Sequence, residues 1–200
     1  SSDLVHPGYG FLAENEDFAS ACADAGLTFI GPTPQAIALM GSKTAARAVA
    51  IDAGAPVVPG TTEALGAEVA DAEVARIAAD VGYLIMLKAV AGGGGKGIRV
   101  VAGPADLSSA LRAARSEAGA SFGDSSVYLE RRIVRPRHIE VQLLADHHGT
   151  VLPFVERECS IQRRHQKVIE ESPSPVVDAR LRRRLASAAA SIAARVGYTN

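Results

Sequence analysis

The sequence has few of the residues that mark several classes of protein. It contains two cysteines, no tryptophan and few other aromatic side chains. Cys22 and Cys159 lack metal-ligand spacing, and two thiols form no disulfide framework, so we expect a reducing compartment. No apolar run approaches the roughly 18 residues that a membrane span needs, and no charged leader precedes an apolar core. We therefore expect a cytoplasmic protein that neither enters a membrane nor is secreted.

Strong net charge is also absent. With 21 basic and 22 acidic residues the formal charge is −1, so no general attraction to nucleic acid or anionic membrane is expected. Apolar residues make up 48% of the 200 residues and charged residues 22%, as in globular proteins. The chain opens with Ser1 rather than Met and stops at Asn200 just after a helical pattern, so we expect an internal piece of a longer protein.

Glycine, proline and capping residues divide the chain into alternating helices and strands. They predict the end of an α/β unit first, then a small α+β unit within a larger one. Ser42 is placed to cap the second of two short helices. The expected helices cover 14–25, 34–40, 42–54, 68–81, 104–118 and 178–196, and the expected strands cover 27–30, 83–89, 98–101, 127–133, 138–145 and 151–158.

The sharpest local signal is the glycine run from Ala91 to Gly97, AGGGGKG. Glycines let backbone N–H groups approach phosphate oxygens closely, although a hairpin tip with no ligand would have the same composition. The run does not fit a Walker motif, because Lys96 is followed by Gly97 and a β-type segment rather than by Ser or Thr and a helix. Strand, glycines and strand together predict a hairpin flap over phosphates.

Lysine is rare here: of 21 basic residues, 17 are arginine and four are lysine. Lys88 lies in the apolar strand segment YLIMLKA and needs an anion nearby, unless its ammonium reaches solvent. Lys43 follows the cap Ser42 in the first turn of a helix, where a positive charge opposes the helix dipole unless an anion is bound. These positions predict an anionic ligand.

Residues 156–171, ERECSIQRRHQKVIEE, are dense in polar groups. A nucleic-acid patch at Arg163–Lys167 is one interpretation, but no aromatic residues interleave it and glutamates flank it. A polar wall that binds small anions fits better. A zinc site is not expected, because the histidines lack regular spacing and no cysteine pairs with them.

Taken together, the motifs resemble biotin carboxylase, the ATP-grasp component of biotin-dependent carboxylases. The resemblance covers nearly the whole chain. It rests on HPGYGFLAEN, IGP, MGSK, the GGGGKG hairpin, YLER, PRHIEVQLLAD and ERECSIQRRHQKVIEESP. It implies an incomplete α+β ATP-grasp fold over 31–200, with a lid subdomain at about 61–132. Residues 1–30 would be the last αβ unit of a Rossmann-like domain that precedes it.

The resemblance also implies roles for particular residues. Lysines at 43 and 88 would hold ATP phosphates, one on each side of the nucleotide, and the flap would meet the β- and γ-phosphates. Lys167 would be catalytic, facing bicarbonate and the transferring phosphate. The nucleotide-binding residues implied are Lys43, Lys88, Gly94, Gly95, Glu130, Arg131, Ile133, His138, Gln162 and His165.

The implied reaction uses ATP and bicarbonate to carboxylate biotin through carboxyphosphate. Expected partners are a biotin carboxyl carrier, a carboxyltransferase and, for the whole parent, further copies of itself. The family's Mg²⁺ ligands would lie beyond residue 200, so no metal ligand is expected here, and the piece alone would be inactive. Two alternatives stay open: another ATP-grasp ligase, such as a carbamoyl-phosphate synthetase, or an inactive nucleotide-binding module. The acyl acceptor is not specified by these residues.

Overall fold

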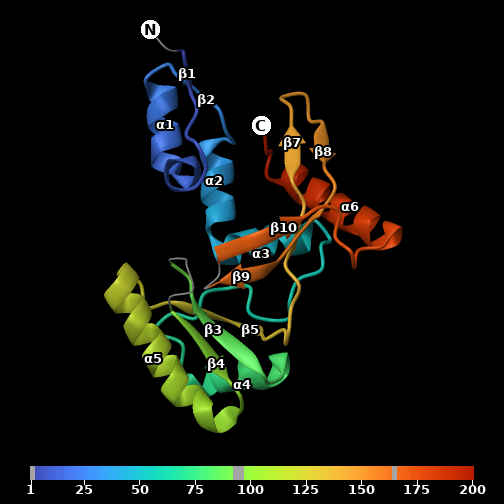
Figure 1. The fold of residues 1–200 in the computed structure, drawn as a ribbon. Helices are drawn as coiled ribbons and strands as arrows, with labels where there is room; N and C mark the ends of the chain where they lie inside the picture. The colour runs from blue at the N-terminus through green and yellow to red at the C-terminus, as the bar shows by residue number, and fades with distance from the viewer. Residues whose placement is uncertain (1–2, 92–96, 164–165) are drawn as a thin grey trace. The chain divides into compact units, whose positions relative to one another are not determined.

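The computed structural model describes residues 3–91, 97–163 and 166–200. The chain divides into two compact units, one made of Ser1–Pro56 with Arg137–Asn200 and the other of Val57–Pro136 (Figure 1). Within the described ranges, no helix combines the length and apolar character needed to cross a membrane.

The first unit opens with a small βαβ arrangement. Strand β1 (Leu4–Val5) pairs in parallel with β2 (Thr28–Phe29), and the 3₁₀ helix η1 (Phe11–Glu14) and helix α1 (Glu16–Asp24) connect them. Asn15 caps α1 by accepting a hydrogen bond from the Phe18 N–H at 2.6 Å. The helix expected at 14–25 and the short strand after it are therefore confirmed.

Two helices continue this unit. Helix α2 (Pro34–Gly41) is capped by Thr33, and α3 (Lys43–Asp52) is capped by Ser42, whose Oγ accepts from the Ala45 N–H at 3.4 Å. The predicted capping by Ser42 is confirmed, and it makes Lys43 the first residue of α3.

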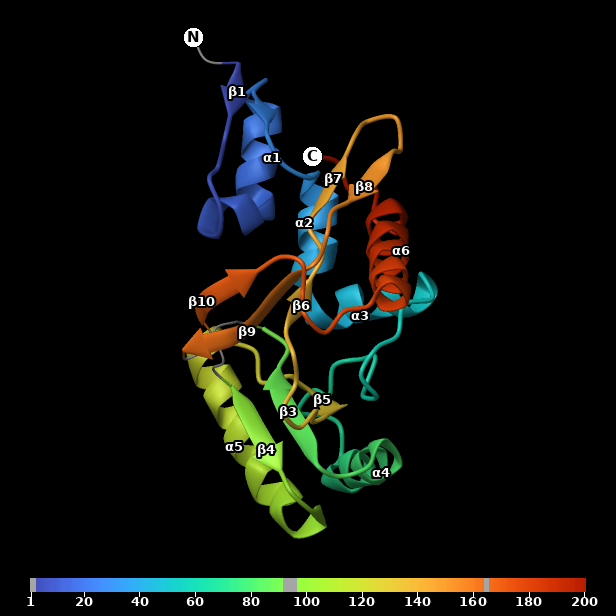
Figure 2. The same cartoon turned by 45° about the vertical axis from the view of Figure 1, so that its right-hand side comes forward.

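The second unit is a sheet covered on one face by two helices. Strands β3 (Ile85–Ala89), β4 (Ile98–Val101) and β5 (Val127–Arg131) are antiparallel in the order β4-β3-β5. Helices α4 (Asp71–Val81) and α5 (Pro104–Phe122) pack against this sheet, as Figure 2 shows from a second direction. The predicted helix at 68–81 begins three residues late, and the one at 104–118 runs four residues further.

Alternation along the strands separates the two faces of this sheet. Ile85, Leu87 and Leu129 are fully buried against Val74 of α4 and Leu111 of α5. The opposite face carries Met86, Lys88, Tyr128 and Glu130. The helices therefore use one face as a core and leave the polar face available for other contacts.

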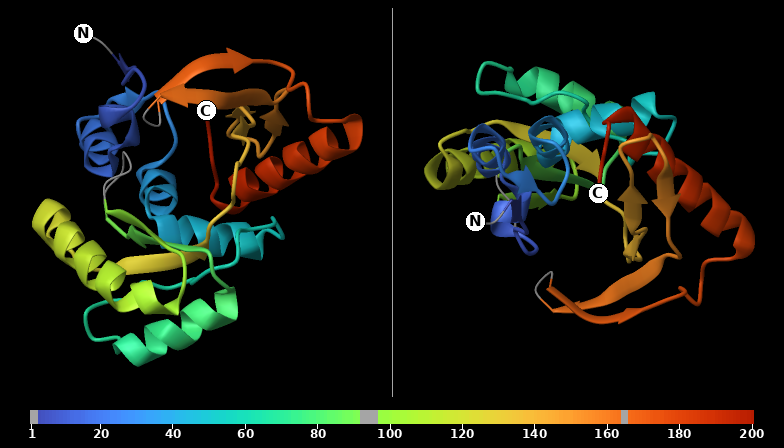
Figure 3. Two further views of the ribbon diagram at one scale, coloured as in Figure 1. Left: turned by 60° about the horizontal axis from the view of Figure 1, so that its bottom comes forward. Right: turned by 90° about the horizontal axis from the view of Figure 1, so that it is seen from above.

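The remainder of the first unit holds two small sheets and a helix. Strands β6 (Ile139–Glu140), β9 (Arg157–Arg163) and β10 (Gln166–Glu171) form an antiparallel sheet in the order β10-β9-β6. Strands β7 (Leu143–Ala145) and β8 (Val151–Pro153) form a hairpin, against which helix α6 (Ala179–Arg195) packs (Figure 3).

Two predicted strands are wrong in their extent. The strand expected at 138–145 is two strands, β6 and β7, which belong to different sheets. The strand expected at 151–158 ends at Pro153, and β9 begins at Arg157. The Phe154 N–H donates to the Gln142 carbonyl at 2.8 Å. Gln142 lies between β6 and β7 and Phe154 lies between β8 and β9, so the two segments pass between the two sheets side by side.

An ion pair with a buried carboxylate holds the segment between β8 and β9 in place. The Glu156 carboxylate is 1% exposed and accepts two hydrogen bonds from Arg182 of α6, both at 2.7 Å. It also accepts the Ser174 N–H at 3.2 Å. The hydrogen bonds from Arg182 lower the pKa of Glu156 to about 2 although burial acts in the opposite direction. The start of β9 is thereby tied to α6 and to the loop before it.

Candidate functional site

The lysine in the apolar strand has the anionic neighbour that its position requires. On the polar face of the second unit's sheet, the Lys88 ammonium forms an ion pair with Glu130, with side chains 22% and 17% exposed. The same ammonium lies 5.9 Å from the centre of the Tyr128 ring. Lys88 and Glu130, two residues predicted separately, are therefore brought together. They form a partly buried charged pair that a polyanion could join.

The segment that ends β5 offers backbone groups. The Arg131 and Arg132 N–H groups are taken by the carbonyls of Pro59 and Leu84, at 2.8 and 2.9 Å. Within the described residues, the N–H of Ile133 has no such partner, and its side chain is 54% exposed. A free backbone donor beside an exposed apolar side chain suits the edge and face of a planar base.

The side chain of Arg131 is engaged at the end of α4. Its guanidinium donates to the Val81 carbonyl at the end of α4, with Nε at 3.0 Å. In this position the guanidinium satisfies a carbonyl of the last turn of α4.

The end of the glycine run is held tightly, although Gly94 and Gly95 lie outside the described residues. Gly97 is buried with φ +71°, and a Cβ there would come 2.9 Å from the Cβ of Ala89. Its carbonyl accepts from the Ala89 N–H at 3.1 Å. Gly97 therefore fixes where the run rejoins the sheet, one residue along β3 from Lys88.

In the first unit, two of the predicted residues gather around a carboxylate that was not predicted. Glu140 on β6 pairs with Lys167 on β10 and accepts from Arg157 Nε on β9 at 2.7 Å. The His138 Nε2 lies 3.6 Å from the same carboxylate. Glu140 and Arg157 also line a cavity of about 460 Å³, with Lys167, Met40 and Tyr198 among its other walls.

These contacts set the charge of each group. Partial burial raises the pKa of Glu140, but hydrogen bonds from Lys167 and Arg157 outweigh it and lower the pKa to about 2. The hydrogen bond to Glu140 in turn raises the pKa of Lys167. Lys167 is therefore an ammonium at neutral pH, which suits it to binding an anion and not to accepting a proton.

The other predicted residues of this unit are placed as follows. Gln162 donates from Nε2 to the Cys159 carbonyl at 2.8 Å and lies opposite Lys167 in the β9–β10 register. Lys43 is half-buried at the first position of α3. The prediction for His165 falls outside the described residues.

Glu140 could have been found from the sequence. His138 and Glu140 are two positions apart in a segment predicted as a strand, and such residues share a face. Arg157 gave a weaker signal, because its side chain was one of many charged residues in the polar segment.

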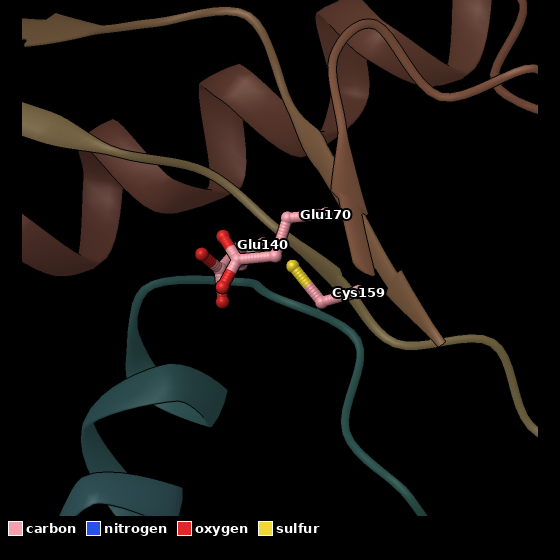
Figure 4. A group of neighbouring side chains, drawn as sticks. All are labelled: Glu140, Cys159 and Glu170. Carbon is pink, nitrogen blue, oxygen red and sulfur yellow. The ribbon is translucent and has the colours of Figure 1, made fainter. Parts of the chain in front are cut away.

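Glu140 also belongs to a cluster of possible metal ligands, whose side chains are turned toward one another in Figure 4. Ligand atoms of Glu140, Cys159 and Glu170 lie within 4.8 Å of one another. Two cations, Arg157 and Lys167, already neutralise Glu140, and burial raises the pKa of the Cys159 thiol. A divalent ion would have to displace both cations and a proton, so these residues do not fit a Mg²⁺ site.

Two known family models match successive segments of the chain. A model described as "Biotin carboxylase, N-terminal domain" matches residues 1–37, and "Carbamoyl-phosphate synthase L chain, ATP binding domain" matches residues 42–200. Over 199 residues, 100% of this chain, the sequence is 49% identical to a biotin carboxylase of Nostoc sp., covering 44% of that protein.

Solved structures of biotin carboxylases also have the fold of this chain. A biotin carboxylase–β-γ-ATP complex from Campylobacter jejuni has a TM-score of 0.90 at 48% identity, covering 99% of this chain and 44% of that one. The biotin carboxylase domain of Hydrogenobacter thermophilus 2-oxoglutarate carboxylase, a dimer with MgADP, ADP and bicarbonate, has a TM-score of 0.90 at 43% identity, covering 99% and 43%. The chain spans less than half the length of each relative.

Proposed function

Because the chain belongs to the biotin carboxylase family of ATP-grasp proteins, we propose that it is the ATP-binding part of an enzyme that carboxylates carrier-bound biotin with bicarbonate. The observation that carries the proposal most directly is the pair of lysine–glutamate contacts, Lys88–Glu130 and Lys167–Glu140. Lys88 is partly buried in the strand that precedes the glycine run predicted to bind phosphate, and Lys167 is an exposed member of the polar segment predicted to bind small anions.

The nucleotide contacts divide by chemistry. Lys43 and Lys88, with the amides of Gly94 and Gly95, are assigned to the phosphates. The segment from Glu130 to Ile133 is assigned to the adenine pocket, supported by the available N–H and exposed side chain of Ile133. His138, Gln162 and His165 are assigned to the rest of the nucleotide.

The reaction begins when a bicarbonate oxygen attacks the γ-phosphorus of ATP. The bond from that phosphorus to the bridging oxygen breaks, which releases ADP and leaves carboxyphosphate. The bond between the carboxyl carbon and the phosphate oxygen then breaks, the carboxyl group passes to N1 of biotin, and the departing phosphate takes up the N1 proton. Such transfers depend mainly on positioning and on neutralising phosphate charge.

Lys167 supplies such a charge where bicarbonate meets the γ-phosphate. Since the pKa of Lys167 is raised by Glu140, its contribution is electrostatic stabilisation rather than proton removal. The base that deprotonates bicarbonate is therefore assigned to another residue. Mg²⁺ would neutralise phosphate charge when bound, but the described residues hold no ligand set that fits it.

The wider setting follows from the same assignment. Partners would be a biotin carboxyl carrier protein or domain and a carboxyltransferase, the intact enzyme would be a homo-oligomer, and it would act in the cytoplasm, for example in fatty acid biosynthesis.

The test is ADP formation by the intact protein with Mg²⁺ and free biotin. We expect ADP formation to require bicarbonate, to rise with biotin, and to fall at least tenfold in Lys167→Met. Formation of ADP that rises with ammonia or glutamine and not with biotin would favour a carbamoyl-phosphate synthetase. Absence of both activities together with ATP binding would favour an inactive nucleotide-binding module.

A further inference from the structure

One carboxylate outside the predicted site contacts the end of the glycine run. Glu117 lies on α5 and accepts the Gly97 N–H through Oε1 at 3.2 Å. Its other oxygen, Oε2, accepts from the Arg99 guanidinium of β4 at 2.7 Å. One side chain therefore joins the helix to the backbone at the root of the run and to the strand that follows it.

Gly97 has little freedom to move once this contact is made. Its carbonyl is bound by the Ala89 N–H and its N–H by Glu117. The 2.9 Å approach that a Cβ would make to Ala89 leaves no room on that side. The orientation of the Gly97 peptide is thus set from β3 on one side and from α5 on the other.

The ion pair itself contributes little to the stability of the fold. The side chains of Arg99 and Glu117 are 46% and 34% exposed, and water screens such pairs. The consequence of the contact is geometric: it fixes the Gly97 peptide beside Ala89, which follows Lys88 on β3.

We propose that Glu117 is a positioning residue for nucleotide binding, acting through the amide of Gly97. The inference rests on the proposed function, since it assumes that the glycine run contacts phosphates. Among the described residues the Glu117 carboxylate contacts Gly97 and Arg99, and it holds the peptide that ends the run one residue along β3 from Lys88.

The test compares three variants of the intact protein. Glu117→Met keeps the length of the side chain and removes both acceptor oxygens. Glu117→Gln keeps an acceptor for Gly97, and Arg99→Met removes only the ion pair. Isothermal titration gives the Kd for ATP, steady-state kinetics give KM for ATP and for bicarbonate, and thermal unfolding monitors the fold.

We expect Glu117→Met to raise Kd and KM for ATP by about two- to tenfold, the effect of one lost hydrogen bond. KM for bicarbonate should not change, and Glu117→Gln and Arg99→Met should stay within twofold of the wild type. Equal ATP affinity in Glu117→Met and the wild type overturns the positioning role alone. Equal losses in all three variants also overturn it, because the ion pair would then be the cause.

A wild type that binds no ATP overturns both the positioning role and the proposed function. If Glu117→Met does not fold, Glu117→Gln and Glu117→Ala replace it as the matched pair, with the same expectations.

Discussion

Replacing Glu140 by glutamine should destabilise the protein in a manner that depends on pH. The carboxylate holds two cations, Arg157 and Lys167, which would repel each other without it. Its pKa is lowered from 4.5 to about 2 in the folded chain, which corresponds to about 3 kcal/mol of stability at neutral pH.

The sign of the pH dependence follows from the direction of the shift. A lowered folded-state pKa gives stability that is fully present above about pH 4.5 and is lost as pH falls toward 2. By pH 3 the contribution should have fallen to about 1.5 kcal/mol. The difference between wild type and Glu140→Gln should therefore shrink by about half between pH 7 and pH 3.

Urea unfolding followed by far-ultraviolet circular dichroism measures this difference at each pH. Glu170→Gln is the matched control: this carboxylate is 41% exposed and lies 3.5 Å from the same Arg157, so less than about 1 kcal/mol should be lost. A penalty for Glu140→Gln that is the same at pH 7 and pH 3, or no larger than that for Glu170→Gln, would refute the electrostatic account.

Three further substitutions test other contacts. Arg182→Met should cost about 3–5 kcal/mol in urea unfolding, because it leaves the buried Glu156 carboxylate without its cation. Lys88→Met should weaken ATP binding at least about tenfold by titration, since a charged hydrogen bond to phosphate is lost, and Lys88→Arg should not restore it. Gly60→Ala should cost about 1–3 kcal/mol, because a Cβ there would lie 2.4 Å from the Leu129 carbonyl oxygen.

Each of these three substitutions has a control substitution at a comparable position. Arg183→Met, an exposed change on the same helix as Arg182, should cost less than about 0.5 kcal/mol. Arg76→Met, on the exposed surface of α4, should leave ATP affinity unchanged. Gly103→Ala, where nothing lies within 4 Å of an added Cβ, should cost less than Gly60→Ala. If a control substitution loses as much stability or ATP affinity as its test variant, the structural reason given for that test variant is wrong.

The predicted α+β fold and the resemblance to biotin carboxylase are confirmed, and the helices were predictable for local reasons. Ser42 and the Pro34 and Pro104 starts mark three helix beginnings, and each is observed. Such signals depend on a few neighbouring residues and do not need the rest of the fold.

The strands of the polar region were harder to predict. Every residue of β10 is exposed, so the alternation of apolar and polar residues that burial of one face imposes is missing. The breaks between β6 and β7 and between β8 and β9 were also missed. They arise because the chain changes sheets there, and no local signal in the sequence marks a change of partner.

In the candidate site, too, single residues could be predicted from local sequence but their long-range pairings could not. Lys88 was identified because a charge in an apolar strand is unusual, but its pairing with Glu130, 42 residues away, depends on the register of β3 and β5. The strand alternation placed Glu140 on the same face as His138, but its pairing with Arg157 and Lys167 requires three strands to meet, which no local pattern in the sequence shows.

Isotope transfer tests the central proposal most directly. The intact protein would be incubated with ATP, Mg²⁺, biotin and ¹⁸O-labelled bicarbonate, and the released phosphate analysed by mass spectrometry at short times. If bicarbonate attacks the γ-phosphorus, one labelled oxygen appears in the phosphate for each ADP formed. Phosphate that takes its oxygen from water instead, in a protein that consumes ATP without bicarbonate, would contradict the proposed reaction.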